Sequence, residues 1–317
     1  MNKRPKELLL IITAMAGYLA YEDAGRLFQS ISNRNRVIKE LKEAGYISVI
    51  SSKGLRTINL LKPAREHVRN QYPDLLIYEH YTGDLETKKR RCTVGKLLTN
   101  MSLMGISITK KDKDSLFLLK MDGAGSDRGY RNGRMVGIYS TPDMAYMTYQ
   151  LGSQGIRWND RREMSQAALT YAKLKKETGM LIVSDTLEVL LEILQNTDLP
   201  EREKRIRNSA GTQRIHLSGH QLPVYFVCTE NVNAAGLEMK ILADLQTQEM
   251  FQAIFGSLGE SVLIPFDLRK LYGLWKETIR QTVYVQECYE EYVSKLLPAH
   301  QVIGVPAEGI AGVLRGE

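Results

Sequence analysis

Residues 21–60 constrain the fold more than any other stretch, because four different local patterns follow one another there without a gap. The successive segments are a short helix at Tyr21–Gln29, a turn at Ser30–Ser32, a second helix at Asn33–Ala44 that Gly45 ends, and a β-hairpin at Tyr46–Leu60 that turns around Ser52-Lys53-Gly54. The helices are predicted from apolar residues at helical spacing. The hairpin is predicted from the alternation of apolar and polar residues on both sides of a turn.

The order helix, turn, helix, hairpin predicts a winged helix-turn-helix over residues 1–72. A further helix at Lys6–Ala20 precedes the motif, with apolar residues at helical spacing, and would complete a three-helix core. We expect Ser32 to cap the second motif helix, because a serine hydroxyl can accept a hydrogen bond from an amide of the first turn. Ile31 is expected to anchor the turn.

The excess positive charge of the chain lies in the same segment. Residues 1–72 contain thirteen Lys or Arg and six Asp or Glu, whereas the rest of the chain contains thirty of each. A polyanionic partner explains this asymmetry better than a solvated basic surface does. We therefore expect double-stranded DNA as the partner of the N-terminal segment.

A helix that enters the major groove of DNA needs cations for phosphates, and amide or guanidinium groups for base edges. The start of the second motif helix supplies both, and this is the end that meets bases in the motif. The hairpin adds cations that could reach a neighbouring groove or the backbone. The expected DNA-binding residues are Asn33, Arg34, Asn35, Arg36, Lys39, Lys53 and Arg56. An ordinary solvated helix face is the alternative.

The composition favours a cytoplasmic protein without a membrane span. No run is apolar over the roughly 18 residues that a membrane helix needs. The apolar run Leu8–Ile12 follows cationic residues, but no small-residue cleavage site comes after it, so we interpret it as part of a domain helix rather than a signal peptide. Cys92, Cys228 and Cys288 lie far apart with no pairing motif, which favours a reducing compartment.

The rest of the chain is predicted to form a helical linker at residues 73–113 and an α/β domain at residues 114–317. The linker carries four consecutive cations, Lys88 to Arg91, which suit either a second DNA contact or a solvated patch. In the α/β domain, apolar strands alternate with helices, which is typical of a sheet covered on both faces.

Local patterns place helices and strands within that domain. The predicted strands are Ser115–Lys120, Met135–Ser140, Ala145–Tyr149, Met180–Ser184, Val224–Thr229 and Val262–Pro265. The predicted helices are Arg161–Glu177, which Gly179 is expected to stop, Asp185–Asn196, Asn233–Phe255 and Asp267–Leu297, with a tail at Pro298–Glu317. The charged stretch Thr197–Gly211 is expected to be exposed.

One set of residues in the α/β domain suggests metal-dependent hydrolysis. Asp143 follows Pro142 after a predicted strand, and Glu238 is followed two residues later by Lys240. Nucleases of the restriction-endonuclease-like class use Pro-Asp and acid-x-Lys motifs to hold Mg²⁺ and activate water. The two halves are about ninety residues apart here, and Glu238 is predicted on a helix rather than on a strand.

Other candidate sites are weaker. Glu163 and Lys173 lie on one predicted helix. His216 and His220 are spaced for metal binding on a helix, but Gly219 favours a loop and no acidic ligand adjoins them. No glycine-rich phosphate loop is present, and we expect neither a bound metal nor a cofactor.

The segment LFQSISNRNRVIKELKEAGYI, followed by the hairpin and INLLKPAREH, resembles the front of the replication-relaxation proteins of bacterial plasmids and conjugative elements. The block GRMVGIYSTPDMAYMTYQLGSQGIRW resembles the second domain of such proteins. The resemblance implies an N-terminal winged helix-turn-helix and a C-terminal α/β domain with a restriction-endonuclease-like sheet. Because no complete catalytic motif is present, the resemblance implies a degenerate sheet used for docking or dimerisation.

Three functional hypotheses follow. The first is a double-stranded DNA-binding protein of a plasmid or mobile element, acting in replication, mobilisation or transcriptional control, whose α/β domain makes a homodimer or recruits a partner. The second is a Mg²⁺-dependent nuclease or nicking enzyme that uses Asp143, Glu238 and Lys240. The third is a protein–protein adaptor whose winged helix binds no DNA.

Overall fold

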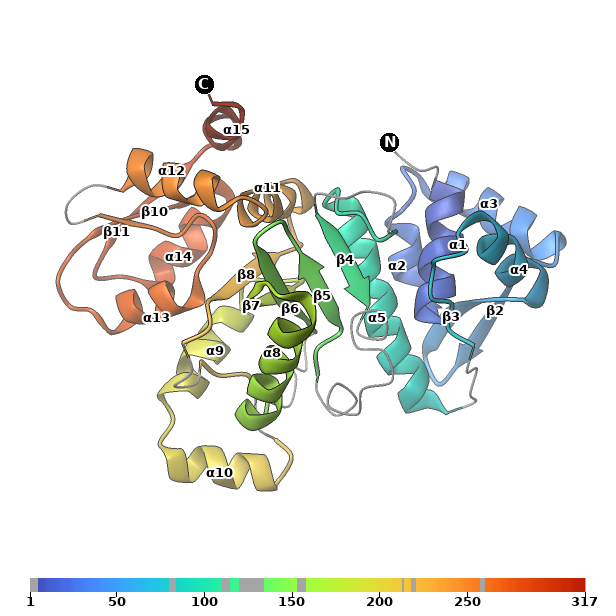
Figure 1. Ribbon diagram of the computed structural model, residues 1–317, viewed down its shortest axis with the longest axis horizontal. Helices are drawn as coiled ribbons and strands as arrows, with labels where there is room; N and C mark the ends of the chain where they lie inside the picture. The colour runs from blue at the N-terminus through green and yellow to red at the C-terminus, as the bar shows by residue number, and fades with distance from the viewer. Residues whose placement is uncertain are drawn as a thin grey trace. The chain divides into compact units, whose positions relative to one another are not determined.

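A computed structural model of the chain describes residues 5–79, 84–109, 115–119, 134–152, 158–212, 214–217, 221–256 and 260–316. These residues form a mixed α/β protein (Figure 1). The contacts of the chain divide it into two compact units, Met1–Lys113 and Asp114–Glu317. The predicted linker at 73–113 therefore belongs to the first unit.

The first unit combines helices with a small antiparallel sheet. Its elements are α1 (Pro5–Ala16), β1 (Leu19–Ala20), α2 (Tyr21–Gly25), α3 (Ile31–Glu43), β2 (Ile47–Ser52), β3 (Leu55–Leu60), α4 (Lys62–Gln71) and α5 (Leu85–Leu103). The strand order is β1-β3-β2, and both pairings are antiparallel. β2 and β3 therefore form a hairpin that β1 extends.

The core of this unit lies where α1, α3 and the sheet meet. Leu9 and Ile12 of α1, Leu41 of α3, and Ile47 and Ile58 of the hairpin are all buried. α1 is buried on all sides from Leu9 to Ala16, whereas α3 buries one face through Val37, Ile38 and Leu41. The apolar positions predicted from the sequence thus supply the core.

The first helix ends earlier than predicted. α1 stops at Ala16, and Gly17 adopts a left-handed conformation with φ +82°. A Cβ atom at position 17 would lie 2.2 Å from Cδ1 of Tyr78, so the ring packs directly on the glycine. Conformation and close packing both require glycine here, and the chain turns into β1 instead of continuing as helix to Ala20.

The second unit contains two sheets. Its elements are β4 (Leu116–Leu119), β5 (Gly137–Ser140), β6 (Met144–Leu151), α8 (Asp160–Leu174), β7 (Glu177–Ser184), α9 (Val189–Asp198), α10 (Glu201–Ser209), β8 (Val224–Cys228), α11 (Val232–Leu242), α12 (Leu245–Phe255), β9 (Glu260–Val262), α13 (Leu268–Lys276), β10 (Thr282–Gln286), the 3-10 helix η1 (Glu287–Tyr289), α14 (Glu290–Leu296), β11 (Gln301–Val305) and α15 (Ala307–Arg315).

The larger sheet has the strand order β4-β5-β6-β7-β8. The first two pairings are antiparallel and the last two are parallel, so the sheet is mixed. On one face, the hydroxyls of Tyr139 and Tyr146 donate to carbonyls of α11. On the other face, Tyr149 and Ile182 belong to a buried cluster with Ala167 of α8 and Leu190 of α9. Helices therefore cover both faces, as the apolar strands predicted.

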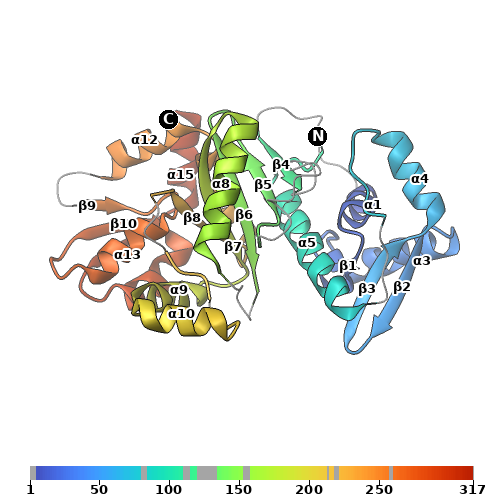
Figure 2. The ribbon, with the colours of Figure 1, turned by 60° about the horizontal axis from the view of Figure 1, so that its bottom comes forward.

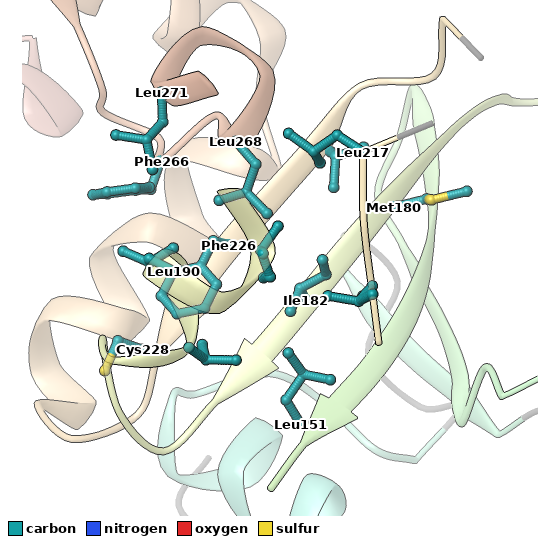
Figure 3. Packing of buried hydrophobic residues seen from close by; sticks show 14 of the residues in the cluster. Leu151, Met180, Ile182, Leu190, Leu217, Phe226, Cys228, Phe266, Leu268 and Leu271 are labelled. Carbon is teal, nitrogen blue, oxygen red and sulfur yellow. The ribbon is translucent and has the colours of Figure 1, made fainter. Parts of the chain in front are cut away.

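The same cluster joins this sheet to the helices that follow it. Figure 3 shows Ile182 and Phe226 of the sheet lying toward Leu190 of α9, with Phe266 and Leu271 packed beyond them. The smaller sheet has the order β11-β10-β9 with both pairings parallel. Figure 2 shows its strands between α13 on one side and α12 with α15 on the other.

The C-terminal part differs most from the prediction. Instead of one amphipathic helix at 267–297 and a tail, the chain forms α13, β10, α14, β11 and α15. The β10 segment TVYVQ places Val283 and Val285 in the core on alternate residues, a strand periodicity. The expected domain with C-terminal helices thus also contains a three-stranded parallel sheet.

Two further boundaries are corrected. α8 ends at Leu174 with Lys175 in the left-handed region at φ 56°. Gly179 lies inside β7, where a Cβ atom would be 2.9 Å from Cδ1 of Tyr146, so this glycine makes room for the ring instead of ending the helix. The predicted helix 233–255 is two helices, because Asp244 caps α12 by accepting from Gln246 N.

Candidate nucleic-acid interface

Helix α3 presents most of the expected DNA-binding residues, and both of its ends are fixed by the local sequence. At its start, the Ser30 hydroxyl oxygen accepts from the amide of Asn33 at 3.2 Å. At its end, Tyr46 N donates to Leu41 O at 2.9 Å and Gly45 N donates to Lys42 O at 3.0 Å, with Gly45 at φ +66°. This pattern is a Schellman motif, which explains why Gly45 ends the helix as predicted.

The start of α3 differs from the prediction by two residues. Ser30, not Ser32, is the N-cap, so Ile31 is the first helical residue. Ile31 is 69% exposed and does not anchor the turn. The earlier start places an apolar side chain at the solvent-exposed tip of α3.

A cluster around Tyr21 connects α2, α3 and the hairpin. We call Tyr21, Arg34, Asn35 and Arg56 the Tyr21 cluster. The guanidinium carbons of Arg34 and Arg56 lie 4.9 Å and 3.7 Å from the centre of the Tyr21 ring. Nε and Nη2 of Arg34 donate to Oδ1 of Asn35 at 3.2 and 3.1 Å, and the Tyr21 hydroxyl donates to the same oxygen at 3.4 Å.

In the Tyr21 cluster, two guanidinium groups lie near one aromatic ring. A cation over an aromatic face is stabilised by roughly 0.5–1 kcal/mol at an exposed site. Because one guanidinium comes from α3 and the other from β3, the ring fixes the helix and the hairpin in one orientation. The cluster therefore groups the half-buried Arg34 with the exposed Asn35 and Arg56.

The remaining polar residues of α3 divide between two flanks. Asn35, Lys39 and Lys42 follow one another at helical spacing on the first flank, and all three are exposed. Lys39 Nζ lies 3.8 Å from Oε1 of Glu43, a weak exposed ion pair. The first flank thus carries two cations and an amide, with Glu43 as its one acid.

The second flank is neutralised by contacts within the unit. Nη1 of Arg36 donates to Glu40 at 3.0 Å and its Nη2 donates to Asn33 at 3.1 Å. Lys6 of α1 lies 3.8 Å from the same Glu40 carboxylate. Arg36 is 67% exposed, but binding a phosphate would compete with its carboxylate partner.

The hairpin turns through two residues with positive φ, Lys53 at 46° and Gly54 at 82°. Two such residues are required by the type I′ turn that suits the twist of a hairpin. Lys53 is exposed at the tip. Arg56 pairs across the strands with Ser51 and extends back over Tyr21. Lys53 therefore lies at the tip of the hairpin, whereas Arg56 belongs to the Tyr21 cluster.

The cationic run at the start of α5 makes contacts within the first unit. Arg91 donates through Nη2 to Met15 O at 2.7 Å and through Nε to Ala16 O, and its guanidinium carbon lies 3.9 Å from the centre of the Tyr78 ring. Lys89 pairs with Glu86 at 2.9 Å. Arg91 thus satisfies carbonyls at the C-terminus of α1, a structural use of a cation.

The three residues considered for nuclease chemistry, Asp143, Glu238 and Lys240, do not form one site. Asp143 is exposed in the turn between β5 and β6. Glu238 is completely buried on α11, where it accepts from Gln286 Nε2 at 2.6 Å and from Phe266 N at 3.0 Å. Lys240 is exposed, and two residues along a helix place it on the opposite side from Glu238. The side chains of Glu238 and Lys240 therefore point in opposite directions and cannot both contact one bound metal ion.

Burial also changes the protonation of Glu238. Loss of hydration raises its pKa to about 8, although its two hydrogen bonds act in the opposite direction. No positive group compensates the carboxylate in these contacts. Glu238 therefore has a structural role, because its hydrogen bonds connect α11 to the segment around Phe266.

The weaker candidates are also separated. Glu163 is buried and accepts from the Tyr149 hydroxyl, whereas Lys173 is exposed farther along α8. His216 is buried near Asp160, with 3.8 Å between Nε2 and Oδ2, and His220 lies outside the described residues. Among the residues that the structure describes, no group of three His, Cys, Asp or Glu is arranged to hold a metal ion.

Comparison with family models, with curated proteins and with solved structures found no match to this chain. Of the helices that the structure describes, none has the length and apolarity needed to cross a membrane.

Sequence reasoning missed Tyr21, whose ring joins α3 to the hairpin in the candidate interface. Its partners Arg34 and Arg56 lie 13 and 35 residues away, so no local pattern joins them. The only signal was an aromatic residue at the start of the first motif helix. Helix α10 was also missed, because its sequence EREKRIRNS contains one large apolar residue and no helical apolar stripe.

Proposed function

We propose that residues 5–60 form a winged helix-turn-helix and that the protein binds double-stranded DNA through it. In this proposal α1, α2 and α3 are the three helices, α3 is the recognition helix, and the β2–β3 hairpin is the wing. The order of the elements and the antiparallel sheet β1-β3-β2 support the assignment. The charge of residues 1–72, thirteen cations against six anions, supports a polyanionic partner.

The observation that carries the proposal is the Tyr21 cluster. It groups the half-buried Arg34 with the exposed Asn35 and Arg56 around one ring, and so joins the proposed recognition helix to the proposed wing. Arginine suits guanine and phosphate oxygens, and asparagine suits adenine. On α3, Lys39 and Lys42 continue this surface along the first flank. Ile31, exposed at the tip of α3, suits contact with a thymine methyl group.

A binding series tests the proposal at the cluster. We expect Arg34→Ala with Arg56→Ala to weaken DNA binding by roughly 1–3 kcal/mol for each arginine that contacts a base. Lys62→Ala with Lys89→Ala is the matched control, because it removes two exposed cations from α4 and α5 of the same unit. Fluorescence anisotropy on DNA enriched by selection measures the change. Equal affinity of both double variants for that DNA would remove the Tyr21 cluster from the interface.

We also propose that the β4–β8 sheet is a degenerate restriction-endonuclease-like sheet that docks or dimerises. Support comes from its mixed strand directions, its helices on both faces, and the burial of Glu238 away from Lys240. The proposed setting is plasmid or mobile-element DNA, in replication, mobilisation or transcriptional control. Light scattering tests dimerisation, and genome-wide mapping of bound DNA tests the setting.

A further inference from the structure

Helix α10 of the second unit is the only one of the described α-helices of at least eight residues that buries none of its own residues. It spans Glu201–Ser209 and lies beyond α8 and α9 at the edge of its unit (Figure 1). Isolated helices of this length are not stable in water, so contacts with neighbours must hold it.

Polar contacts provide that support. Arg207 donates from Nη1 to Asn196 of α9 at 2.9 Å and from Nη2 to Glu203 at 3.1 Å. A cavity of about 380 Å³ separates α10 from α9, and another of about 340 Å³ lies between α10 and the start of α8. The helix is thus attached at its inner side while its outer side faces solvent.

Both acidic residues of α10 form ion pairs with cations on the same helix. Lys204 pairs with Glu201 at 3.1 Å, and Arg207 pairs with Glu203. Two further cations, Arg202 and Arg205, are exposed one helical turn apart. Among the described residues, neither guanidinium donates a hydrogen bond or forms an ion pair. Lys204 first, and Arg205 to a smaller extent, lower the pKa of the Glu201 carboxyl.

The surroundings of α10 add a third exposed arginine, beside the acids Asp160 and Glu201. Arg161, exposed at the start of α8, lines the same cavity as Arg205 and Lys204. Ile206, 59% exposed, lies next to Arg205 on the outer face. Residues 114–317 contain twenty-two Lys or Arg and twenty-five Asp or Glu, so this cationic face contrasts with the slightly acidic unit that carries it.

We infer that the outer face of α10, formed by Arg202, Arg205 and the neighbouring Arg161, binds the phosphate backbone of DNA as a second contact. The partner follows from the proposed function, on which this inference rests. Arginines can each bind phosphate oxygens through two parallel hydrogen bonds. Contacts of this kind position a protein on the duplex without reading its sequence. The second unit thereby adds affinity to the recognition by α3.

Salt-dependent binding of the full-length protein to a fluorescein-labelled random-sequence duplex tests the inference. Arg202→Gln with Arg205→Gln should weaken binding by roughly tenfold and make the slope of log K against log salt shallower by about 1.8, or about 0.9 per phosphate contact. Glutamine keeps a high helix propensity, and α10 buries nothing, so thermal unfolding should be unchanged.

The matched control is Lys173→Gln with Arg280→Gln, two exposed cations elsewhere on the same unit. If the α10 variant and this control bind alike, with equal slopes, the α10 contact is wrong while the proposed function stands. If the α10 variant loses binding but Arg34→Ala with Arg56→Ala does not, the winged-helix proposal fails and the α10 contact stands. A wild-type protein that binds no duplex at low salt overturns both.

Discussion

Lys53 shows at the scale of one residue how stability and binding can oppose each other. It occupies the first position of the type I′ turn at φ 46°, where asparagine, aspartate or glycine is the common choice. A left-handed conformation costs most L-residues roughly 1 kcal/mol. The side chain is exposed and adds a cation at the tip of the proposed wing, which gives a functional reason for tolerating that cost.

We expect Lys53→Asn to raise the free energy of unfolding by about 0.5–1 kcal/mol, because asparagine tolerates positive φ. The same change should weaken DNA binding several-fold, because it removes a cation from the wing. Urea unfolding and anisotropy measure the two effects, and Lys53→Gly controls for turn geometry without adding an amide. A variant that gains stability and keeps full affinity would place the wing tip away from DNA.

At the scale of secondary-structure elements, the cationic run on α5 shows that neighbouring charges can have different roles. Arg91 reaches the last carbonyls of α1 and stacks over Tyr78, whereas Lys89 pairs only with Glu86 on its own helix. The sequence predicted the charges but not their partners, because the end of α1 lies about 75 residues away. The run therefore supports the packing of α5 against α1.

We expect Arg91→Ala to lower the free energy of unfolding by roughly 1.5–3 kcal/mol, because two hydrogen bonds from a charged group to backbone carbonyls are lost. Lys89→Ala, an exposed neighbour, should change it by less than about 0.5 kcal/mol. Chemical denaturation of both variants gives the comparison. Similar stabilities, with DNA binding lost only in Arg91→Ala, would instead favour the second DNA contact considered from the sequence.

The elements predicted well are those with a strong local signal. α3, the hairpin and the Schellman glycine Gly45 follow from spacing and turn chemistry alone. The sequence pattern predicts helix at β10, because its short apolar alternation lies between two amphipathic helices. Pairing with β9 and β11 makes this segment a strand. α10 has no apolar stripe, and a hydrogen bond from Arg207 attaches it to Asn196 of α9.

At the scale of the whole molecule, the distribution of charge along the chain could be predicted from the sequence. The partner and the burial of each ionisable group could not. The count of cations in residues 1–72 identified the basic segment. It could not show that Glu40 neutralises Arg36, or that Arg34 and Arg56 share one ring. The Pro-Asp and Glu-x-Lys pattern likewise gave residue types without their directions, since Glu238 faces inward and Lys240 outward.

Glu238 provides a test of whether that pattern is structural or catalytic. Its pKa of about 8 lies above the 4.5 of an ordinary glutamate, so the folded protein favours the protonated form. The stability gained from protonation is complete below pH 4.5 and is lost as the pH rises through about 8. Glu238→Gln cannot ionise, so its stability should vary less between these pH values.

We expect the free energy of unfolding of Glu238→Gln, relative to that of the wild type, to rise by an amount on the order of a few kcal/mol as the pH increases from 4.5 through 8, as a shift of this size implies. Urea titrations across the pH range measure the difference, with Glu230→Gln as an exposed-acid control. The structural role also predicts that supercoiled plasmid stays intact with wild-type protein and Mg²⁺. Mg²⁺-dependent nicking that disappears in Glu238→Gln would instead require Glu238 to reach a metal ion, and the buried arrangement would then have to open during the reaction.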